Sequence, residues 1–171
     1  MSRFWKLLVM ICFLIIADQL SKGWVQTNFL LGQSRTVIEG FFNFTYVQNT
    51  GAAFGMGGDA SEFTRKLMFL LLPTVFSVWV FWMLVTTIKG PKHMSLAYSL
   101  ILAGAVGNLI DRYTLGYVVD FFQFYYWPNK PFHVFNVADA CITIAGFLLV
   151  IDVILQARAK RRQATDPSTV A

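Results

Sequence analysis

Four long apolar stretches constrain this sequence more than any other feature. They cover about residues 4–22, 67–88, 94–111 and 134–155, and each is close to the roughly 20 residues that a helix needs to cross the hydrocarbon core of a bilayer. The composition agrees, because only 13% of the residues are charged, about half the share found in a typical soluble domain. The sequence therefore predicts a mainly α-helical membrane protein with four transmembrane helices in a single membrane domain.

The lysines and arginines between these stretches predict how the chain crosses the membrane. Four crossings place both termini on one side, which would then hold eight Lys and Arg residues against six on the other. Because cytoplasmic segments carry the excess of Lys and Arg, we expect both termini in the cytoplasm. The net charge of +5 is then a topology signal. We expect no nucleic-acid partner, since neither a binding motif nor a basic soluble domain accompanies that charge.

Two loops would lie on the opposite side of the membrane. In the longer loop, about residues 23–66, aromatic side chains alternate with other residues over 42–47, which predicts a short strand with one apolar face. Four glycines then predict tight turns, at positions 51, 55, 57 and 58. The shorter loop, about residues 112–133, is dense in aromatic residues. Such rings are typical of a membrane–water interface, where they either anchor the protein or form a platform for a lipid-bearing substrate.

Ionisable residues at membrane depth are costly and suggest function by default. Asp18 and Lys22 are four residues apart, so they share a helix face, and we interpret them as a structural ion pair. Asn108 and Arg112 have the same spacing at the end of the third apolar stretch, where Arg112 can hold a carboxylate or backbone carbonyls. For Asp111, a solvated charge at a helix end and a buried residue are equally good interpretations.

Asp120 and Asp139 differ from these charges, because apolar residues flank them and no basic residue lies within four positions. The third stretch ends and the fourth begins on the same side of the membrane, so the chain can bring both carboxyls together. Two close carboxyls share a proton, and one can then act as a base toward water while the other acts as an acid. This is the chemistry of an aspartic protease. From the residues alone, a proton relay in a small transporter is an equal alternative, and a subunit that only packs helices is a third.

Competing chemistries find little support in the sequence. The two histidines, His93 and His133, are predicted on opposite sides of the membrane, and no set of three or four ligands has the spacing of a zinc site. The nucleophile-elbow and phosphate-loop motifs are absent from the sequence as well. We therefore expect neither a metal nor a cofactor.

Five short motifs, in chain order, resemble those of the lipoprotein signal peptidase (signal peptidase II) family, which are aspartic peptidases of bacterial membranes. In this sequence they read DQLSK (18–22), NTGAAF (49–54), GNLIDR (107–112), VVDF (118–121) and FNVAD (135–139). Each motif is weak by itself. Five of them in order, on a chain with four apolar stretches, make a specific pattern that covers nearly the whole sequence.

The resemblance implies a substrate and a set of site residues. The substrate would be a prolipoprotein whose cysteine already carries diacylglycerol, and cleavage would fall just before that cysteine. Asp120 and Asp139 would be the catalytic pair, with no assignment of acid and base. The residues that would bind the peptide backbone or the lipid are Asn49, Gly51, Asn108, Arg112 and Asn136.

The resemblance also implies the surroundings of the site. The loop at 23–66 resembles the family's small extracytoplasmic β-domain, which cradles the substrate, and the site would face the outside of the bacterial cytoplasmic (inner) membrane. The interfacial aromatic residues would contact the acyl chains, which favours the platform interpretation. Globomycin-like cyclic peptides would inhibit the protein. We further expect contact with membrane lipids and a monomeric state.

Overall fold

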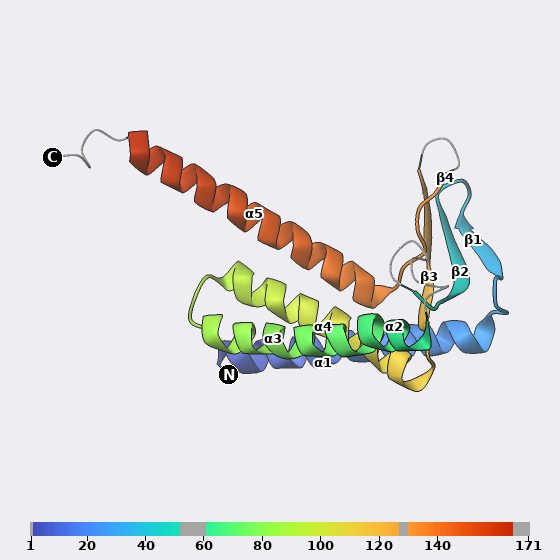
Figure 1. Ribbon diagram of the computed structural model, residues 1–171. Helices are drawn as coiled ribbons and strands as arrows, with labels where there is room; N and C mark the ends of the chain where they lie inside the picture. Colours follow the sequence, from blue (N-terminus) through green and yellow to red (C-terminus); the bar gives the residue numbers. More distant parts are fainter. Residues whose placement is uncertain (1, 52–60, 127–129, 166–171) are drawn as a thin grey trace.

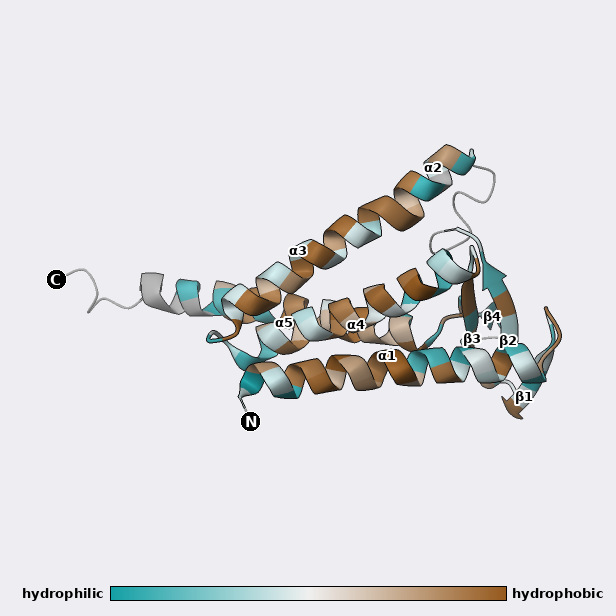
Figure 2. Ribbon diagram, turned by 90° about the horizontal axis from the view of Figure 1, so that it is seen from below, coloured by the Kyte–Doolittle hydropathy of each residue, from teal (hydrophilic) through white to brown (hydrophobic). Residues whose placement is uncertain are grey.

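Four helices run the length of the molecule, and each is long and apolar enough to cross a membrane. The computed structural model describes residues 2–51, 61–126 and 130–165. The first helix is α1 (Arg3–Asn28). The second consists of three consecutive segments: α2 (Glu62–Lys66), a π-helical turn η2 (Leu67–Leu71) and α3 (Leu72–Thr87). The third is α4 (Lys92–Thr114) and the fourth is α5 (Val137–Thr165). Apolar residues dominate the middle of α1 and α3, with hydrophilic residues toward the ends of α1 (Figure 2).

Helix α4 is the centre of the bundle. In the most apolar 18-residue stretch of α4, 61% of the residues are buried, whereas the corresponding share in the other three helices is 11–22%. The reason is that α4 packs against α1, α3 and α5. Two glycines allow α5 to approach closely. A Cβ on Gly104 would collide with the Ala138 carbonyl oxygen, and one on Gly107 would lie 3.2 Å from the Ala138 Cβ. Because so few residues of the other three helices are buried, most of their apolar surface is left for lipid, as expected of membrane-spanning helices.

A four-stranded antiparallel sheet lies at one end of the helices, and the start of α1 and the end of α5 lie toward the other (Figure 1). Its strands, in spatial order, are β1 (Ser34–Ile38), β2 (Phe42–Asn49), β3 (Val118–Tyr126) and β4 (Lys130–Pro131). Strand β2 contains the alternating segment at 42–47, so the strand predicted there is confirmed. Strand β3 was not predicted. It comes from the second loop, so the sheet joins two loops that the sequence separates widely.

Aromatic residues hold the two central strands together. Phe42 faces Phe124 and Phe44 faces Phe122 across the ladder, and the Phe42 and Phe124 rings stack with centroids 4.7 Å apart. Cross-strand aromatic pairs of this kind stabilise a sheet by roughly 0.2–1 kcal/mol each. Such pairing fixes the register between β2 and β3, and this register positions the polar residues at the strand ends.

The helices extend beyond the predicted bounds. The first was predicted to end at Lys22, but α1 continues to Asn28, because its last turns pack under the sheet. Val25 is 1% exposed there and shares a core cluster with Phe29, Tyr46, Val119 and Phe121. The fourth was predicted over 134–155, whereas α5 starts later and continues to Thr165. The predicted turns at positions 55, 57 and 58 lie outside the described residues.

Candidate active site

Strand pairing and a helix start bring Asp120 and Asp139 into one site. In the ladder, Val47 faces Asp120 and Asn49 faces Val118, so the end of β2 lies beside Asp120. Phe135 is bridged to Phe122 of the same strand β3, and α5 begins directly after it at Val137. The pairing of β2 with β3 and the bridge between Phe122 and Phe135 therefore bring residues from both loops and from α5 together.

Asp120 is a buried carboxyl, only 2% exposed. Its Oδ2 accepts a hydrogen bond from Asn49 Nδ2 at 3.0 Å, and its Oδ1 accepts one from Asn136 Nδ2 at 2.7 Å. Burial, followed by the nearby charge of Asp139, raises the pKa of Asp120 to about 7, although the two amide donors act in the opposite direction. Asp120 can therefore hold a proton near neutral pH.

Asp139 takes part in the N-terminal cap of α5. The Asn136 side-chain oxygen accepts from the Asp139 backbone N–H at 2.9 Å, and Asp139 Oδ2 accepts from the Asn136 backbone N–H at 3.2 Å. This reciprocal pair is a capping box. The other carboxylate oxygen, Oδ1, accepts from Asn108 Nδ2 at 2.8 Å. Both oxygens are thus fixed by donors, and the positive end of the helix dipole favours a negative charge at this position.

Two asparagines connect the carboxyls. Asn136 Nδ2 lies 2.7 Å from Asp120 and 3.1 Å from Asn108 Oδ1, and Asn108 in turn donates to Asp139. Asn108 Oδ1 also accepts from Lys22 Nζ at 3.0 Å. Asp120 and Asp139 therefore belong to one hydrogen-bonded network in which amides, rather than cations, contact the carboxyl oxygens.

A charged cluster lies directly behind this network. Lys22 Nζ is 2.8 Å from Asp18 Oδ2 and 3.0 Å from Asp111 Oδ2, and all three residues are 1–2% exposed. The interpretation of Asp111 as a solvated charge is wrong. Its Oδ2 also accepts from the Val119 backbone N–H at 3.0 Å, so the end of α4 is tied to the strand that carries Asp120.

Gln19 completes the charged cluster, and its role was not predicted. Its Nε2 donates to Asp111 Oδ1 at 2.9 Å and to the Gly107 carbonyl at 3.1 Å. Asp18 Oδ1 accepts from the Ala138 backbone N–H at 2.9 Å. Gln19 lies inside the DQLSK motif, and its Nε2 also donates to Asp18 Oδ2 at 3.3 Å. Its bonds to Gly107 and Asp111 span 88 and 92 positions, so spacing contained no signal for them.

Arg112 and Gly51 lie at the edge of the site. Arg112 Nη2 donates to the Gly51 carbonyl at 3.4 Å, and the Gly51 N–H donates to Asn49 Oδ1 at 3.1 Å. Within the described residues the hydrogen bond of Arg112 goes to this carbonyl and not to a carboxylate. The remainder of the predicted NTGAAF motif, at 52–54, lies outside the described residues.

Three cavities surround these residues. One of about 460 Å³ is lined by Asp139, Asn108 and Arg112 together with apolar side chains of α5 such as Ile142. A smaller one, of about 270 Å³, is lined by Asp120, and Asn49 and His133 line both. The two carboxyls thus face adjoining spaces on either side of a shared wall.

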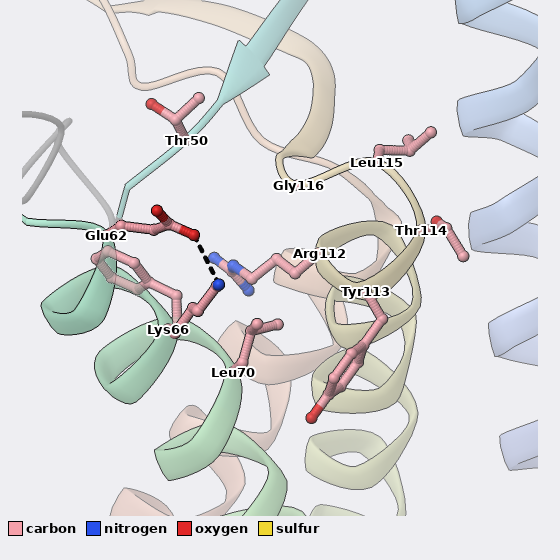
Figure 3. A pocket seen from close by; sticks show the side chains of 10 residues that line it. Thr50, Glu62, Lys66, Leu70, Arg112, Tyr113, Thr114, Leu115 and Gly116 are labelled. Carbon is pink, nitrogen blue, oxygen red and sulfur yellow. Dashed lines mark ion pairs between the residues drawn. The ribbon is translucent and has the colours of Figure 1, made fainter.

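The third cavity, of about 490 Å³, lies between α2 and the end of α4. Figure 3 shows the Arg112 side chain extending from α4 toward Lys66 and Glu62 of α2. Arg112 therefore separates this cavity from the one that Asp139 lines. In the described ranges, no group of three or more His, Cys, Asp or Glu side chains is arranged to hold a metal ion.

Comparisons with known proteins agree with this architecture. Residues 10–155 match the family model described as Signal peptidase (SPase) II. A lipoprotein signal peptidase from Shewanella loihica is 44% identical over 157 residues, covering 90% of this chain and 88% of that protein. Another, from Syntrophomonas wolfei, is 39% identical and covers 95% of this chain and 99% of that protein.

Solved structures are similar as well. A bacterial membrane enzyme determined by the in meso method at 2.3 Å resolution superposes with a TM-score of 0.78 at 31% identity, covering 91% of both chains. A second, determined by the same method at 1.9 Å, gives a TM-score of 0.66, also at 31% identity, over 86% of this chain and 92% of that one. The predicted fold class, four membrane-spanning helices with a small sheet, is thereby confirmed.

Proposed function

Because the chain belongs to the signal peptidase II family, we propose that it removes the signal peptide from diacylglyceryl-modified bacterial prolipoproteins, cleaving just before the lipidated cysteine, with Asp120 and Asp139 as the catalytic pair. Family membership makes the chain an aspartic endopeptidase of the membrane. One observation carries the residue assignment. Asp120 and Asp139 are joined through Asn136 and Asn108 and face cavities large enough for a peptide.

The surroundings of the two carboxyls suggest which one holds the proton. Asp120 is buried and its pKa is about 7. Asp139 accepts two N–H donors in the first turn of α5, where a negative charge is stabilised. We therefore assign the shared proton to Asp120 and the negative charge to Asp139. In this state Asp120 is the acid and Asp139 is the base.

Hydrolysis then follows with a balanced transfer of protons. The water oxygen attacks the scissile carbonyl carbon, one water proton moves to Asp139, and the Asp120 proton moves to the carbonyl oxygen. This gives a tetrahedral diol. When the C–N bond breaks, Asp139 gives its proton to the leaving nitrogen, and one hydroxyl of the diol returns a proton to Asp120. Both carboxyls end in their starting states.

The neighbouring polar residues are suited to hold the substrate. Asn49, Asn108 and Asn136 fix the carboxyl oxygens, so the carboxyls need not reorient during the reaction. Arg112 lines the cavity that Asp139 lines, where its remaining N–H groups can bind peptide or ester carbonyls. The Gly51 backbone lies beside Asp120 in the smaller cavity, where the absence of a side chain lets the peptide approach.

The position of the site suits a substrate held in a bilayer. The sheet end, with its aromatic residues, is assigned to the outside of the bacterial cytoplasmic (inner) membrane, and both termini to the cytoplasm. The cavity lined by Asp139 continues over exposed apolar residues of α5 such as Ile142 and Ile144, which acyl chains would cover. Globomycin-like peptides would bind in the same cavity, and the chain would act as a monomer surrounded by lipid.

A cleavage assay on matched variants tests these assignments. Purified protein in detergent is incubated with a diacylglyceryl-modified prolipoprotein, and the released signal peptide is followed by a gel shift. We expect Asp120→Asn and Asp139→Asn each to lower the rate by about 10²- to 10⁴-fold, since each removes a general acid or base. Thermal melting shows whether each variant is folded.

Asp152→Asn is the matched control. Asp152 is also a buried carboxyl, but it pairs with His93 at the far end of α4 and α5, so this variant should cleave at the wild-type rate. A prolipoprotein that lacks the diacylglyceryl group should be cleaved slowly or not at all. If the folded Asp120 and Asp139 variants still cleave, the catalytic pair is wrong. Proton transport in liposomes would then be the next measurement.

A further inference from the structure

The end of the bundle farthest from the sheet holds a basic cavity whose lining includes neither Asp120 nor Asp139. It measures about 380 Å³ and is lined by Arg3, Lys6 and Leu7 of α1 and by Lys92 and Ser95 of α4. Three of its five lining residues are cations and none is acidic. Ser95, which is 1% exposed, supplies a hydroxyl group to its wall.

The placement of these cations opposes the local helix dipoles. Arg3 and Lys92 are the first residues of α1 and α4, and neither helix has an acidic residue in its first turn. Helix N-termini carry partial positive charge and favour anions, so cations there are unfavourable without a counter-charge. Among the described residues, neither Lys6 nor Lys92 has an ion-pair partner. A bound anion would offset both effects.

Arg3 is held in place for such an anion. Its Nη1 donates to the carbonyl oxygens of Ile88 and Gly90, both at 2.7 Å, so the turn between α3 and α4 fixes the guanidinium. Within the described part of the chain these bonds use Nη1 alone, which leaves the N–H groups of Nη2 and Nε for a ligand. Fixed guanidinium donors suit the oxygens of a phosphate group.

We infer that this cavity binds the phosphodiester headgroup of an anionic phospholipid, in the leaflet opposite the catalytic site. Basic pockets between membrane-spanning helices bind such headgroups, and Leu7 provides an apolar wall toward the acyl chains. A general excess of basic residues near the termini would serve topology alone. Here, three cations from two helices line one cavity: Arg3 is partly buried, and Lys6 and Lys92 are exposed. The Ser95 hydroxyl donates to the Lys92 carbonyl oxygen at 3.2 Å, so the cations are the groups that would bind the phosphate oxygens.

Lipid binding by the purified full chain tests this inference. The protein in detergent is titrated with phosphatidylglycerol and, separately, with phosphatidylcholine of the same acyl chains, and bound lipid is counted by native mass spectrometry. We expect phosphatidylglycerol to bind at lower concentration. The double variant Lys6→Gln/Lys92→Gln keeps the structural contacts of Arg3 and should lower that affinity by about fivefold for each cation removed.

Arg158→Gln/Lys160→Gln is the matched control. Both residues are exposed near the C-terminal end of α5, so this variant loses the same charge outside the cavity and should keep wild-type affinity. If both double variants lose affinity equally, or neither does, the cavity is not the binding site. Soluble glycerol phosphate should not displace the lipid at matched concentration. Displacement would identify a site for free phosphate and overturn the assignment to lipid.

Discussion

Two pairs of carboxyls lie at the same end of this molecule, and they are held in opposite ways. Asp18, Asp111 and Asp120 are buried, whereas Asp139 is partly exposed. Asp18 and Asp111 share Lys22, whose Nζ is within 3.0 Å of both. Asp120 and Asp139 share only the amides of asparagines. In the described ranges no lysine or arginine forms an ion pair with either of them. Similar side chains are therefore placed in two different electrostatic environments.

The difference separates a structural role from the catalytic role that we propose for Asp120 and Asp139. A buried carboxylate that contacts a cation can hold helices together. Two close carboxyls that contact only amides cannot lose both protons easily, so such a pair keeps one proton available for transfer. Asn108 connects the two arrangements, because it accepts from Lys22 and donates to Asp139. The charged cluster is thereby connected to the proposed catalytic pair through Asn108.

Removal of the cation is expected to have the largest effect on stability. In Lys22→Met, Asp18 and Asp111 stay buried without the cation that they share, and breaking a buried ion pair from one side costs about 3–5 kcal/mol. We expect a large fall in melting temperature in detergent, with activity lost together with the fold. The triple variant Asp18→Asn/Lys22→Met/Asp111→Asn removes all three charges and should recover much of the loss. Equal melting temperatures for the single and triple variants would contradict this view of the cluster.

The proposed catalytic pair should instead make the stability of the protein depend on pH. The pKa of Asp120 is raised from 3.8 to about 7, so the folded protein binds this proton more tightly than the unfolded chain. The stabilising contribution of the protonated carboxyl is complete below about pH 4 and is lost as pH rises toward 7. In that window the free energy of unfolding falls by about 1.4 kcal/mol for each pH unit, which amounts to about 2–3 kcal/mol between pH 5 and pH 7.

Melting curves measured across this range check the prediction. Wild-type stability should fall from pH 5 to pH 7, and Asp120→Asn, which does not titrate, should lose most of that slope. A wild-type slope that persists in Asp120→Asn would mean that another group carries the pH dependence.

The close approach of α4 and α5 behind the charged cluster gives a smaller effect. A Cβ on Gly107 would lie 2.8 Å from Asp18 Oδ2 and 3.2 Å from the Ala138 Cβ, so Gly107→Ala must displace the carboxylate that Lys22 holds. We expect a loss of about 1–3 kcal/mol, as is usual for overpacking. Gly146→Ala in α5 is the matched control, since no atom lies within 4 Å of the added Cβ. That variant should be neutral or slightly more stable.

Much of the fold was predictable because membrane helices leave a strong signal in a sequence. Apolar runs of about 20 residues match the thickness of the hydrocarbon core, and the aromatic alternation at 42–47 identified β2. Strand β3 was missed because its residues, such as Val119, Phe121 and Phe122, are apolar on both faces, so no alternation is visible. The first helix was predicted too short because a charged residue, Lys22, was taken as its end, although Asp18 and Asp111 neutralise that charge inside the protein.

The sequence singled out residues that the structure brings together, but it did not predict the hydrogen bonds between them. Two acids without basic neighbours were visible in the sequence, and the motifs added the asparagines. The contacts of Asn108 with Lys22 and of Gln19 with Asp111 span 86 and 92 positions. Such contacts depend on how α1 and α4 pack, which no local pattern encodes. The capping box between Asn136 and Asp139 is local, and the three-residue spacing could have predicted it.

The exposed ion pair between Glu62 and Lys66 contrasts with the buried Lys22 cluster, and its removal is expected to have the smallest effect on stability. Its charged atoms are 2.6 Å apart, closer than those of the Lys22 cluster, yet the two side chains are 81% and 66% exposed. Water solvates both charges in the absence of the pair, so an exposed helical pair at this spacing contributes only about 0.3–0.5 kcal/mol. We expect Lys66→Gln to change the melting temperature by little, and less still in high salt, which screens exposed charges. A destabilisation comparable to that of Lys22→Met would show that distance, rather than burial, determines what an ion pair contributes in this protein.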